Sequence, residues 1–486
     1  MNMIWPVLHH AKVQPDTSAL VEGDHVITYR ELVNQISRTA ACLLMLGLKP
    51  GDRVGICLKD TSAHVIAFLA VAGIGAVAVP LDWRARPAEN SRFIEGLGLK
   101  CVLAEPDGRL PTGCVAVTID ANWHRAVNFA APSALLSGDW QDPFVISASS
   151  GSTGAPKFTQ MTHLQYHFAI TAFLELMALA GRHRYLCTLP FYYSGGRNSC
   201  IAHLVRGDTV ILYPNLFSAA EYADVVRRQG ATIGFVAAPT VRSFLAAARD
   251  TPFLSGLTTF FSGGAPLQAE EKRQALHKLN PNFHERYATA ETLGIAVLRP
   301  RDILERAESV GQPHSLAEIE VVDDDDRALD IGGVGRLRYR GPGLASPVSG
   351  DANQANFRDG WYYPGEIARL DELGFLYLQG RSSDVIMRSG AKIFPAEVEG
   401  VLLEHADVAE AAVVAGRGGE NEEEAVAFVV TRRPLQLGEL IAHCRARLSP
   451  HKVPRHFRFM PELPTNTAGK IDKMSLARLL APDGTP

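Results

Sequence analysis

One stretch of the sequence combines glycines and hydroxyl-bearing residues with a single lysine: Ser149–Lys157, SSGSTGAPK. Glycine lets the main chain approach a ligand closely, and the hydroxyls, backbone N–H groups and lysine ammonium can donate hydrogen bonds to phosphate oxygens. The stretch is therefore a candidate phosphate-binding loop. A flexible surface loop of the same composition is the structural alternative.

The stretch is not the P-loop of kinases and ATPases, which reads G-x-x-x-x-G-K-[ST]. Pro156 precedes Lys157 where that motif has glycine, and Phe158 follows where it has Ser or Thr. Both the hydroxyl that would bind magnesium and the glycine that lets a helix begin at the lysine are missing. The candidate loop belongs to another class.

The composition sets broad limits. At 486 residues the chain exceeds the size of a single hydrophobic core, so two or more domains are expected. A net charge of -4 gives no reason to expect nucleic acid or an anionic membrane as partner. Seven cysteines without C-x-x-C spacing argue against a disulfide framework or zinc site and favour a cytoplasmic protein.

No signal peptide is expected at the N-terminus, and no membrane span elsewhere. The apolar stretch at residues 65–79 is shorter than the roughly 20 residues of a membrane helix, and Gly73 and Gly75 interrupt it. We expect a buried helix that leads into a buried strand.

The segments up to about residue 315 alternate between helical and strand-like patterns. Helical spacing follows Thr28, a plausible N-cap, and β-rich runs at 208–214, 231–239 and 257–264 each end at Gly or Pro. This alternation predicts α/β layers with mainly parallel sheets. Antiparallel strands are expected after residue 315, with Asp323–Asp326 as a solvated hairpin tip, followed by a compact α+β region of roughly 100 residues.

Further motifs give the chain a resemblance to a known family. They are SGGAPL (Ser262–Leu267), YATAE (Tyr287–Glu291), DGWYYPGE (Asp359–Glu366) with GRSSD (Gly380–Asp384), and PTNTAGK (Pro464–Lys470). Together with SSGSTGAPK they stand in the order and approximate spacing of the adenylate-forming enzymes, the superfamily of acyl-CoA synthetases, peptide-synthetase adenylation domains and firefly luciferase. The resemblance spans nearly the whole chain.

The resemblance implies a fold and a reaction. Residues 1–382 would form a large AMP-binding and acyl-substrate domain of α/β layers plus a β-barrel-like subdomain, and residues 383–486 a small mobile α+β domain. The enzyme would use ATP and Mg²⁺ to convert a carboxylic acid into an acyl-adenylate, and would then transfer the acyl group to coenzyme A. Transfer to a carrier-protein thiol or an amine, or an inactive nucleotide-binding relative, are the alternatives. The oligomeric state is left open, with a homodimer among the options.

The resemblance also assigns roles to residues. Triphosphate contacts fall on Ser150, Gly151, Ser152, Thr153, Gly154 and Lys157. The adenine slot and its surroundings fall on Gly263, Gly264, Ala265, Pro266, Tyr287, Ala288, Thr289 and Ala290. Glu291 would bind Mg²⁺, while Glu366 and Arg381 would contact ribose or phosphate. Lys470 would be the catalytic lysine, Asp384 the hinge, and Ser389 and Gly390 part of the thiol tunnel.

Three positions depart from the family pattern. Phe158 stands where glycine follows the lysine, Ala290 replaces a threonine that donates to the α-phosphate, and Glu366 replaces an aspartate that grips the ribose hydroxyls. Losing one hydrogen bond to a charged group costs about 1.5–3 kcal/mol, which slows an enzyme without abolishing its activity.

The acyl pocket is expected around Pro190–Ser199 and Val236–Thr240. Its candidate residues are Tyr192, Tyr193, Arg197, Asn198, Ala238 and Ser262. The stretch 190–199 contains no acid that could pair with an α-ammonium group, so an ordinary α-amino acid is disfavoured. The tyrosines suit an aromatic, cyclic or medium-length aliphatic acid. Arg197 is either structural or a reader of a second carboxylate or a phosphate on the substrate.

Overall fold

The computed structural model describes residues 2–106, 113–135, 138–150, 156–213, 217–248, 252–348, 352–388, 391–417, 423–465 and 471–480. The chain divides into two compact units. The first comprises Met1–Glu318 and Arg340–Tyr362, and the second comprises Ile319–Tyr339 and Tyr363–Pro486. The domain boundary after residue 382 stays a prediction.

Two large, mainly parallel sheets organise the first unit. In spatial order, the seven-stranded sheet contains β18 (Ser346–Pro347), β8 (Pro156–Thr162), β7 (Pro143–Ser150), β4 (Val77–Pro80), β3 (Arg53–Cys57), β5 (Cys101–Ala104) and β6 (Val115–Thr118). The strands β7 to β6 in this order are parallel, whereas β8 and β18 pair antiparallel. The parallel arrangement expected from the alternating sequence pattern is therefore present.

The nine-stranded sheet contains the strands that carry most of the candidate site. In spatial order these are β15 (Gln312–Pro313), β14 (Ala296–Leu298), β13 (Phe283–Tyr287), β12 (Thr259–Gly263), β11 (Ile233–Ala237), β9 (Arg184–Cys187), β10 (Thr209–Leu212), β1 (Ser18–Glu22) and β2 (His25–Thr28). The six strands from β13 to β1 are parallel, and their carboxyl ends therefore meet at one edge of the sheet. A short hairpin of β19 (Phe357–Arg358) and β20 (Trp361–Tyr362) also belongs to this unit.

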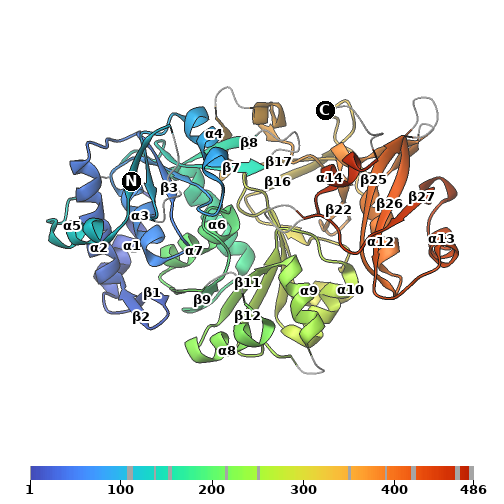
Figure 1. The fold of residues 1–486 in the computed structure, drawn as a ribbon, viewed down its shortest axis with the longest axis horizontal. Helices are drawn as coiled ribbons and strands as arrows, with labels where there is room; N and C mark the ends of the chain where they lie inside the picture. The colour runs from blue at the N-terminus through green and yellow to red at the C-terminus, as the bar shows by residue number, and fades with distance from the viewer. Residues whose placement is uncertain are drawn as a thin grey trace. The chain divides into compact units, whose positions relative to one another are not determined.

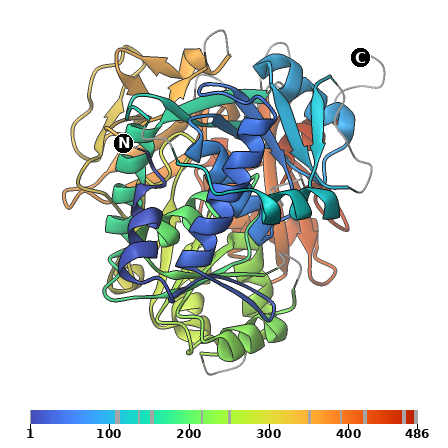
Figure 2. The same ribbon diagram turned by 90° about the vertical axis from the view of Figure 1, so that its left-hand side faces the viewer.

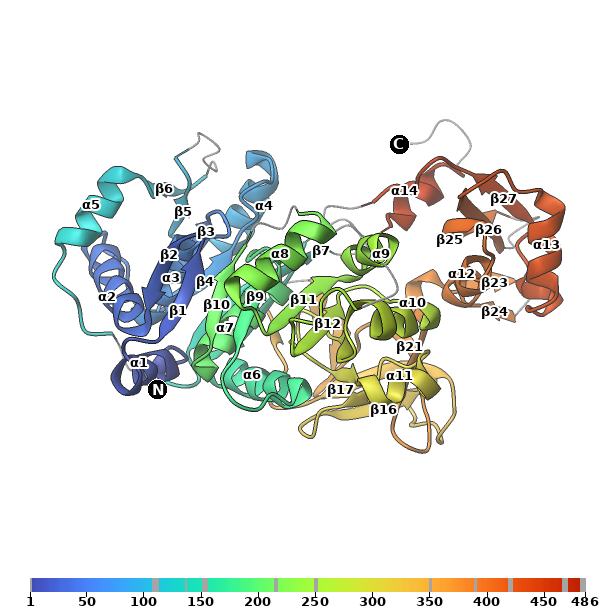
Figure 3. The same ribbon diagram turned by 90° about the horizontal axis from the view of Figure 1, so that it is seen from below.

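Helices cover the faces of both sheets. Their bounds are α1 (Trp5–Val13), α2 (Tyr29–Met45), α3 (Ser62–Gly73), α4 (Pro87–Leu97), α5 (Ala121–Phe129), α6 (His163–Met177), α7 (Ser194–Arg206), α8 (Ala219–Gln229), α9 (Ala238–Ala247), α10 (Ala269–Gln274) and α11 (Pro300–Arg306), with a π-turn at Ala275–Leu279 and a 3₁₀ turn at Ala352–Asn356. Helices α8 to α10 lie on one side of β9, β11 and β12, and α6 lies on the other (Figures 1 and 3). The N-terminal helices, blue in Figure 2, pack beside one another.

Local sequence signals explain where two of these helices begin. Thr28 caps α2: its hydroxyl accepts from the Glu31 N–H at 3.2 Å, and the Glu31 carboxylate accepts from the Thr28 N–H at 2.8 Å. The apolar stretch at residues 65–79 forms most of α3 and then β4, both buried, as the sequence predicts. Of the helices that the structure describes, none is long and apolar enough to span a membrane.

The main hydrophobic core connects the two sheets. It contains Ile56 and Ala78 from the seven-stranded sheet, Phe173 from α6, and Tyr185 and Phe235 from the nine-stranded sheet. Because side chains alternate along a strand, the opposite face of the seven-stranded sheet has its own cluster with α4. The core fixes the two sheets against each other and so fixes the strand ends that carry the candidate site.

The second unit is smaller and begins with antiparallel strands. Its elements are β16 (Glu318–Val322), β17 (Gly335–Arg340), β21 (Glu366–Leu370), β22 (Leu376–Arg381), β23 (Ile386–Arg388), β24 (Ala391–Ile393), α12 (Pro395–Leu403), β25 (Val408–Arg417), β26 (Glu423–Thr431), α13 (Leu437–Arg445), β27 (His456–Phe459) and α14 (Lys473–Arg478), with 3₁₀ turns at Ser382–Asp384 and Pro450–Lys452. The Asp323–Asp326 segment joins β16 and β17, and the Asp323 carboxylate accepts from the N–H groups of Asp325 and Arg327. The expected hairpin tip is confirmed.

Candidate active site

The adenine-slot residues lie at the carboxyl ends of neighbouring parallel strands. Gly263 ends β12 and pairs in register with Ala237 of β11 and Arg286 of β13. Tyr287 ends β13, and Ala238 directly follows β11. In open α/β sheets, ligands bind in the crevice outside the carboxyl ends of the strands. The residues that the sequence assigns to adenine and to the acid therefore come together at one sheet edge.

Two glycines line this edge with backbone alone, which leaves a narrow slot that a flat ligand could enter. A Cβ atom at Gly263 would lie 2.7 Å from the carbonyl oxygen of Arg286, which is too close for any side chain. Gly264 has φ +84°, in the left-handed region that favours glycine, and a Cβ there would lie 3.0 Å from the Tyr193 hydroxyl. Only backbone can occupy this position between the β12 end and Tyr193.

A buried ion pair anchors the segment that follows the glycines. The Glu285 carboxylate accepts from the Leu267 N–H at 3.0 Å and pairs with the Lys272 ammonium at 2.6 Å. Both side chains are almost fully buried, and Lys272 also donates to the Ser309 carbonyl at 2.9 Å. Since Leu267 directly follows Pro266, the pair fixes where the slot ends. The sequence does not reveal this pair, because Lys272 and Glu285 lie just outside the two motifs and meet only in the fold.

The magnesium candidate Glu291 is buried and has an aromatic partner. Only 5% of Glu291 is exposed, and its carboxylate accepts a hydrogen bond from the hydroxyl of Tyr362 on β20. Burial, followed by the charge of Glu291, raises the pKa of Tyr362 well above its usual range. The phenol therefore stays protonated and keeps the carboxylate in one orientation.

The carboxylate fits a magnesium site of the kind that uses few protein ligands. In the part of the chain that the structure describes, no group of three or more His, Cys, Asp or Glu side chains could hold a metal ion. Mg²⁺ is commonly bound by one or two carboxylates together with phosphate oxygens and water. Glu291 would thus share the ion with the nucleotide.

The hydroxyl of Thr289, the neighbour of Ala290, makes its hydrogen bonds within the protein. It lies 3.2 Å from the Thr292 hydroxyl and also contacts Tyr362. The sequence leaves open whether Thr289 substitutes for the missing hydroxyl. These contacts point its oxygen at Thr292 and Tyr362, so the substitution would need a rotamer change.

We predict that Tyr362→Phe raises the KM for MgATP about tenfold, because a hydrogen bond to a charged group is lost while the ring is kept. The measurement is initial rate against MgATP concentration, repeated at high free Mg²⁺, which should restore part of the loss. Tyr363→Phe is the matched control, since the Tyr363 hydroxyl donates to Asp326 instead. Equal effects of both variants would contradict the assignment.

The phosphate-loop candidates sit on a β-hairpin. Strands β7 and β8 pair Ser150 with Pro156 and Ser149 with Lys157, so Ser150 and Lys157 flank the tip. The predicted contacts Gly151, Ser152, Thr153 and Gly154 lie outside the described residues. Phe158 is buried and packs edge-on against Phe93, with ring centroids 5.6 Å apart. This bulky residue therefore anchors β8 to the core directly after Lys157.

Arg197 and Asn198 of α7 are buried and held by protein groups. One Nη of Arg197 donates to the carbonyls of Phe191 and Tyr192 at 3.2 and 3.3 Å, and the other to the Ser147 hydroxyl at 2.7 Å. Asn198 Oδ1 accepts from the Tyr166 hydroxyl at 2.8 Å. These contacts favour the structural alternative for Arg197, which links the strand before the phosphate loop to the turn before α7.

Asp60 is a second anchor of the turn before α7 and is not predicted by the sequence analysis. Its carboxylate accepts from the Phe191 N–H at 2.6 Å. Burial raises the pKa of Asp60, and the Phe191 N–H partly offsets that effect. Beside it, the Arg84 guanidinium lies 5.1 Å above the ring of Tyr192. Asp60 comes three residues after β3, so its place at a strand end is the signal that could have found it.

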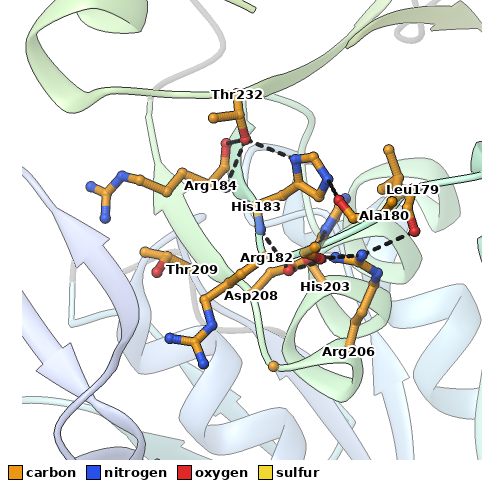
Figure 4. Close-up of polar contacts among 12 residues, drawn as sticks. Leu179, Ala180, Arg182, His183, Arg184, His203, Arg206, Asp208, Thr209 and Thr232 are labelled. Atoms are coloured by element: carbon orange, nitrogen blue, oxygen red, sulfur yellow. Dashed lines mark hydrogen bonds and ion pairs between the residues drawn. The ribbon is translucent and has the colours of Figure 1, made fainter. Parts of the chain in front are cut away.

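A buried polar cluster supports the far end of β9 and α7. Figure 4 shows Asp208 receiving hydrogen bonds from His183, His203 and Arg206. His203 stacks on Tyr185, with ring centroids 4.4 Å apart. Burial acts to raise the pKa of Asp208, but the hydrogen bonds that its carboxylate accepts from His203 and Arg206 contribute to a net lowering of that pKa. The cluster therefore fixes the ring of Tyr185 through its stacking contact with His203.

Three of the residues predicted for the site lie in described parts of the second unit: Glu366, Arg381 and Asp384. Glu366 and Arg381 face each other across β21 and β22, with Arg381 Nε 3.7 Å from Glu366 Oε1. Asp384 ends a 3₁₀ turn and lies 3.9 Å from the Lys473 ammonium. Lys470, Ser389 and Gly390 lie outside the described residues. Their roles stay predictions.

Comparison with family models covers both parts of the chain. The model of the AMP-binding enzyme matches residues 7–347, and the model of the AMP-binding enzyme C-terminal domain matches residues 397–470. The first of these matches alone covers more than half of the chain.

The chain also aligns with individual relatives along nearly the full length of both sequences. The chain is 31% identical to 2-succinylbenzoate–CoA ligase of Bacillus licheniformis, covering 96% of this chain and 98% of the relative. It is 27% identical to indoleacetate–CoA ligase of Aromatoleum aromaticum, covering 97% of each.

A solved relative has the same fold. The o-succinylbenzoate CoA synthetase of Bacillus subtilis matches with a TM-score of 0.88 and 25% identity in its complex with an acyl-adenylate intermediate, covering 97% of each chain. The same enzyme with ATP and magnesium matches with a TM-score of 0.87. The predicted mixed α/β fold with a large N-terminal and a small C-terminal domain is confirmed. The chain is a member of the AMP-binding enzyme family.

Proposed function

We propose that the chain is an ATP-dependent, AMP-forming ligase that joins an aromatic carboxylic acid to coenzyme A. A carboxylate oxygen attacks the α-phosphorus of ATP, and the bond to pyrophosphate breaks. The thiol sulfur of coenzyme A, after losing its proton, then attacks the acyl carbon and expels AMP. The products are the acyl-CoA thioester, AMP and pyrophosphate.

The geometry of the first unit carries this proposal. The hairpin bearing Lys157, the backbone slot at Gly263 and Gly264, and the buried Glu291 carboxylate are all built at or after strand ends. The first half-reaction brings an anion to a polyanion, so its catalysis consists mainly of positioning and charge neutralisation. A cation, a narrow base slot and a magnesium ligand are the groups that such a reaction needs.

ATP and Mg²⁺ fit the residues present. Adenine would lie between the Gly263–Pro266 backbone and Tyr287, and Lys157 would contact the β- and γ-phosphates. Mg²⁺, when bound, would neutralise phosphate charge beside Glu291. Solved relatives with ATP and magnesium support this placement.

The acceptor and the acid follow from different evidence. Coenzyme A is the acceptor named for the relatives above, and two of their acids are 2-succinylbenzoate and indoleacetate. In this chain, Tyr192 and Tyr193 stand where the acid is expected, and the sequence from 190 to 199 has no acidic residue to pair with an ammonium group. We therefore propose an aromatic acid without an α-amino group.

Four residues of the second unit complete the proposal. Lys470 supplies the positive charge that draws the carboxylate and the α-phosphate together. Asp384 is the hinge that separates the two half-reactions, and the segment with Ser389 and Gly390 serves the thiol. The carboxyl-terminal family match reaches residue 470, which supports the assignment of the lysine.

The test is a panel of carboxylic acids incubated with enzyme, ATP and Mg²⁺, with AMP release as the readout. Each acid is assayed with coenzyme A, with a carrier protein and with an amine, and the products are identified by mass. We expect AMP and an acyl-CoA only when an aromatic acid and coenzyme A are both present. AMP release that depends on an amine or a carrier protein instead would reject the acceptor, and no acid-dependent pyrophosphate exchange would indicate an inactive relative.

A further inference from the structure

Leu293 has a backbone conformation that is unusual for its residue type. Its φ is +59°, in the left-handed region, and only 4% of the residue is exposed. Besides glycine, that region holds mainly Asn, Asp and His, and a bulky residue there is an outlier. The next residue, Gly294, could adopt this conformation without a steric cost, but its φ is not positive. The chain therefore places the strained conformation on the leucine and not on the adjacent glycine.

The left-handed residue ends a single helical turn that contains Glu291. The Leu293 N–H donates to the Thr289 carbonyl at 3.2 Å, which is the hydrogen bond of a left-handed helix cap, a position usually taken by glycine. At the base of the loop, the Ile295 N–H donates to the Tyr287 carbonyl at 2.9 Å. The direction in which the Glu291 side chain leaves the turn therefore depends on the backbone at position 293.

The side chain of Leu293 explains why glycine does not occupy this position. Leu293 belongs to the main hydrophobic core, together with Phe173 and Leu176 of α6. Gly294 could not supply the same anchor, since a Cβ atom there would lie 3.0 Å from the Leu176 side chain, closer than ordinary van der Waals contact. Strained backbone persists only where the surrounding structure over-determines it, and burial of the leucine side chain provides that constraint here.

The residues around this anchor hold Glu291 at further points. The Glu291 carbonyl accepts from the Ala345 N–H at 2.8 Å, and its carboxylate accepts from the Tyr362 hydroxyl. Thr292 is 1% exposed, and its hydroxyl accepts from the Thr289 N–H at 3.3 Å. Strained residues cluster at ligand clamps, where a fixed geometry is part of the function. A carboxylate with one direction suits Mg²⁺, which demands near-ideal octahedral geometry.

We propose that Leu293 is a positioning residue for Glu291. The left-handed backbone at Leu293, kept in place by the buried side chain, directs the Glu291 carboxylate at the magnesium ion of MgATP. The proposal rests on the proposed function, in which Glu291 shares Mg²⁺ with the nucleotide. It goes further by making a leucine of the hydrophobic core a determinant of Mg²⁺ affinity.

The first test separates the two properties of Leu293. Leu293→Ile keeps the volume but adds a β-branch that opposes the left-handed conformation, Leu293→Ala loses the anchor, and Leu293→Met keeps both properties. We expect the Ile and Ala variants each to need about tenfold more free Mg²⁺ for half-maximal rate, and the Met variant to resemble wild type. The measurement is acid-dependent pyrophosphate release against free Mg²⁺ at saturating ATP, and the rate at saturating Mg²⁺ should stay close to that of wild type. A wild-type Mg²⁺ requirement in both the Ile and the Ala variant would overturn the proposal.

A control and a double variant separate positioning from a general loss of packing. Leu43→Ile changes a fully buried leucine of the same core that lies in the regular helix α2, and it should leave the Mg²⁺ requirement unchanged. In a Glu291→Gln background, Leu293→Ile should cause no further change in the Mg²⁺ requirement, because it acts through the carboxylate. Equal effects of Leu293→Ile in both backgrounds would mean that the leucine does not act through Glu291.

A binding measurement decides the role of Leu293 without catalysis. The thermal midpoint of wild type should rise more with ATP and Mg²⁺ than with ATP and EDTA, in the absence of acid and coenzyme A. Leu293→Ile, Leu293→Ala and Glu291→Gln should each diminish this difference, and Leu43→Ile should preserve it. If no acid supports AMP release, the proposed function fails, whereas this difference still tests the positioning role. The absence of a difference in wild type, or an equal difference in wild type and both Leu293 variants, would overturn the proposal.

Discussion

Replacing Lys470 with alanine is expected to lower the rate of acid-dependent ATP–pyrophosphate exchange by about 10² to 10³, because one preorganised positive charge is lost where two anions meet. The effect should fall on kcat more than on the KM for either substrate, since the charge acts as the new bond forms. The measurement is exchange of labelled pyrophosphate into ATP at saturating acid.

Two controls make this result specific. Lys452→Ala removes a lysine of the same unit that is paired with Glu397 at 2.7 Å, and it should leave exchange close to the wild-type rate. Thioester formation from a preformed acyl-adenylate should survive in Lys470→Ala, because that half-reaction has no triphosphate to neutralise. Exchange at the wild-type rate in Lys470→Ala would remove the lysine from the centre of the proposed mechanism.

Local signals in the sequence were enough for much of the fold. Thr28 predicts the start of α2 because capping involves residues three positions apart. The stretch 65–79 predicts a buried helix and strand because glycines divide a run that is too short for a membrane. The order of the strands in the two sheets could not be predicted in this way, because pairing depends on contacts between distant segments.

In the candidate site, too, local motifs could be read from the sequence, whereas contacts between distant residues could not. Gly263, Gly264, Tyr287 and Glu291 were predicted because the motifs that contain them resemble those of the adenylate-forming enzymes. Asp60 was missed, since its role depends on a hydrogen bond to Phe191, 131 residues away. Tyr362 was missed as a partner of Glu291 for the same reason.

The free energy of unfolding is expected to fall steeply as the pH drops from 6.5 toward 4.5, because several histidines are buried in their neutral form. Burial lowers the pKa of His64, His163 and His284 from 6.5 to about 4. Arg197 lowers the pKa of His64 further and Arg299 that of His284, whereas Asp142 opposes the shift at His163. The same direction holds for His203 and His314.

The sign follows from proton binding. Below pH 6.5 the unfolded chain protonates these rings, whereas the folded protein does not until the pH approaches 4. The stabilisation is therefore complete above pH 6.5 and is lost as the pH falls toward 4. Each of the three rings contributes about 3 kcal/mol over that interval, which together is comparable to the whole stability of a typical domain.

Proton uptake on unfolding is the direct measurement, by calorimetry in two buffers of different ionisation enthalpy at pH 5.5. Wild type should take up at least two protons more than it does at pH 7.5, with a thermal midpoint that drops accordingly. His64→Gln should remove about one of them, whereas His25→Gln, at an exposed position, should remove none. Carboxylates such as Asp208 cannot produce this result, since its lowered pKa confines its effect to pH values below about 4. A thermal midpoint that stayed constant from pH 7.5 to 5 would mean that these rings are protonated, or hydrated, in the folded protein.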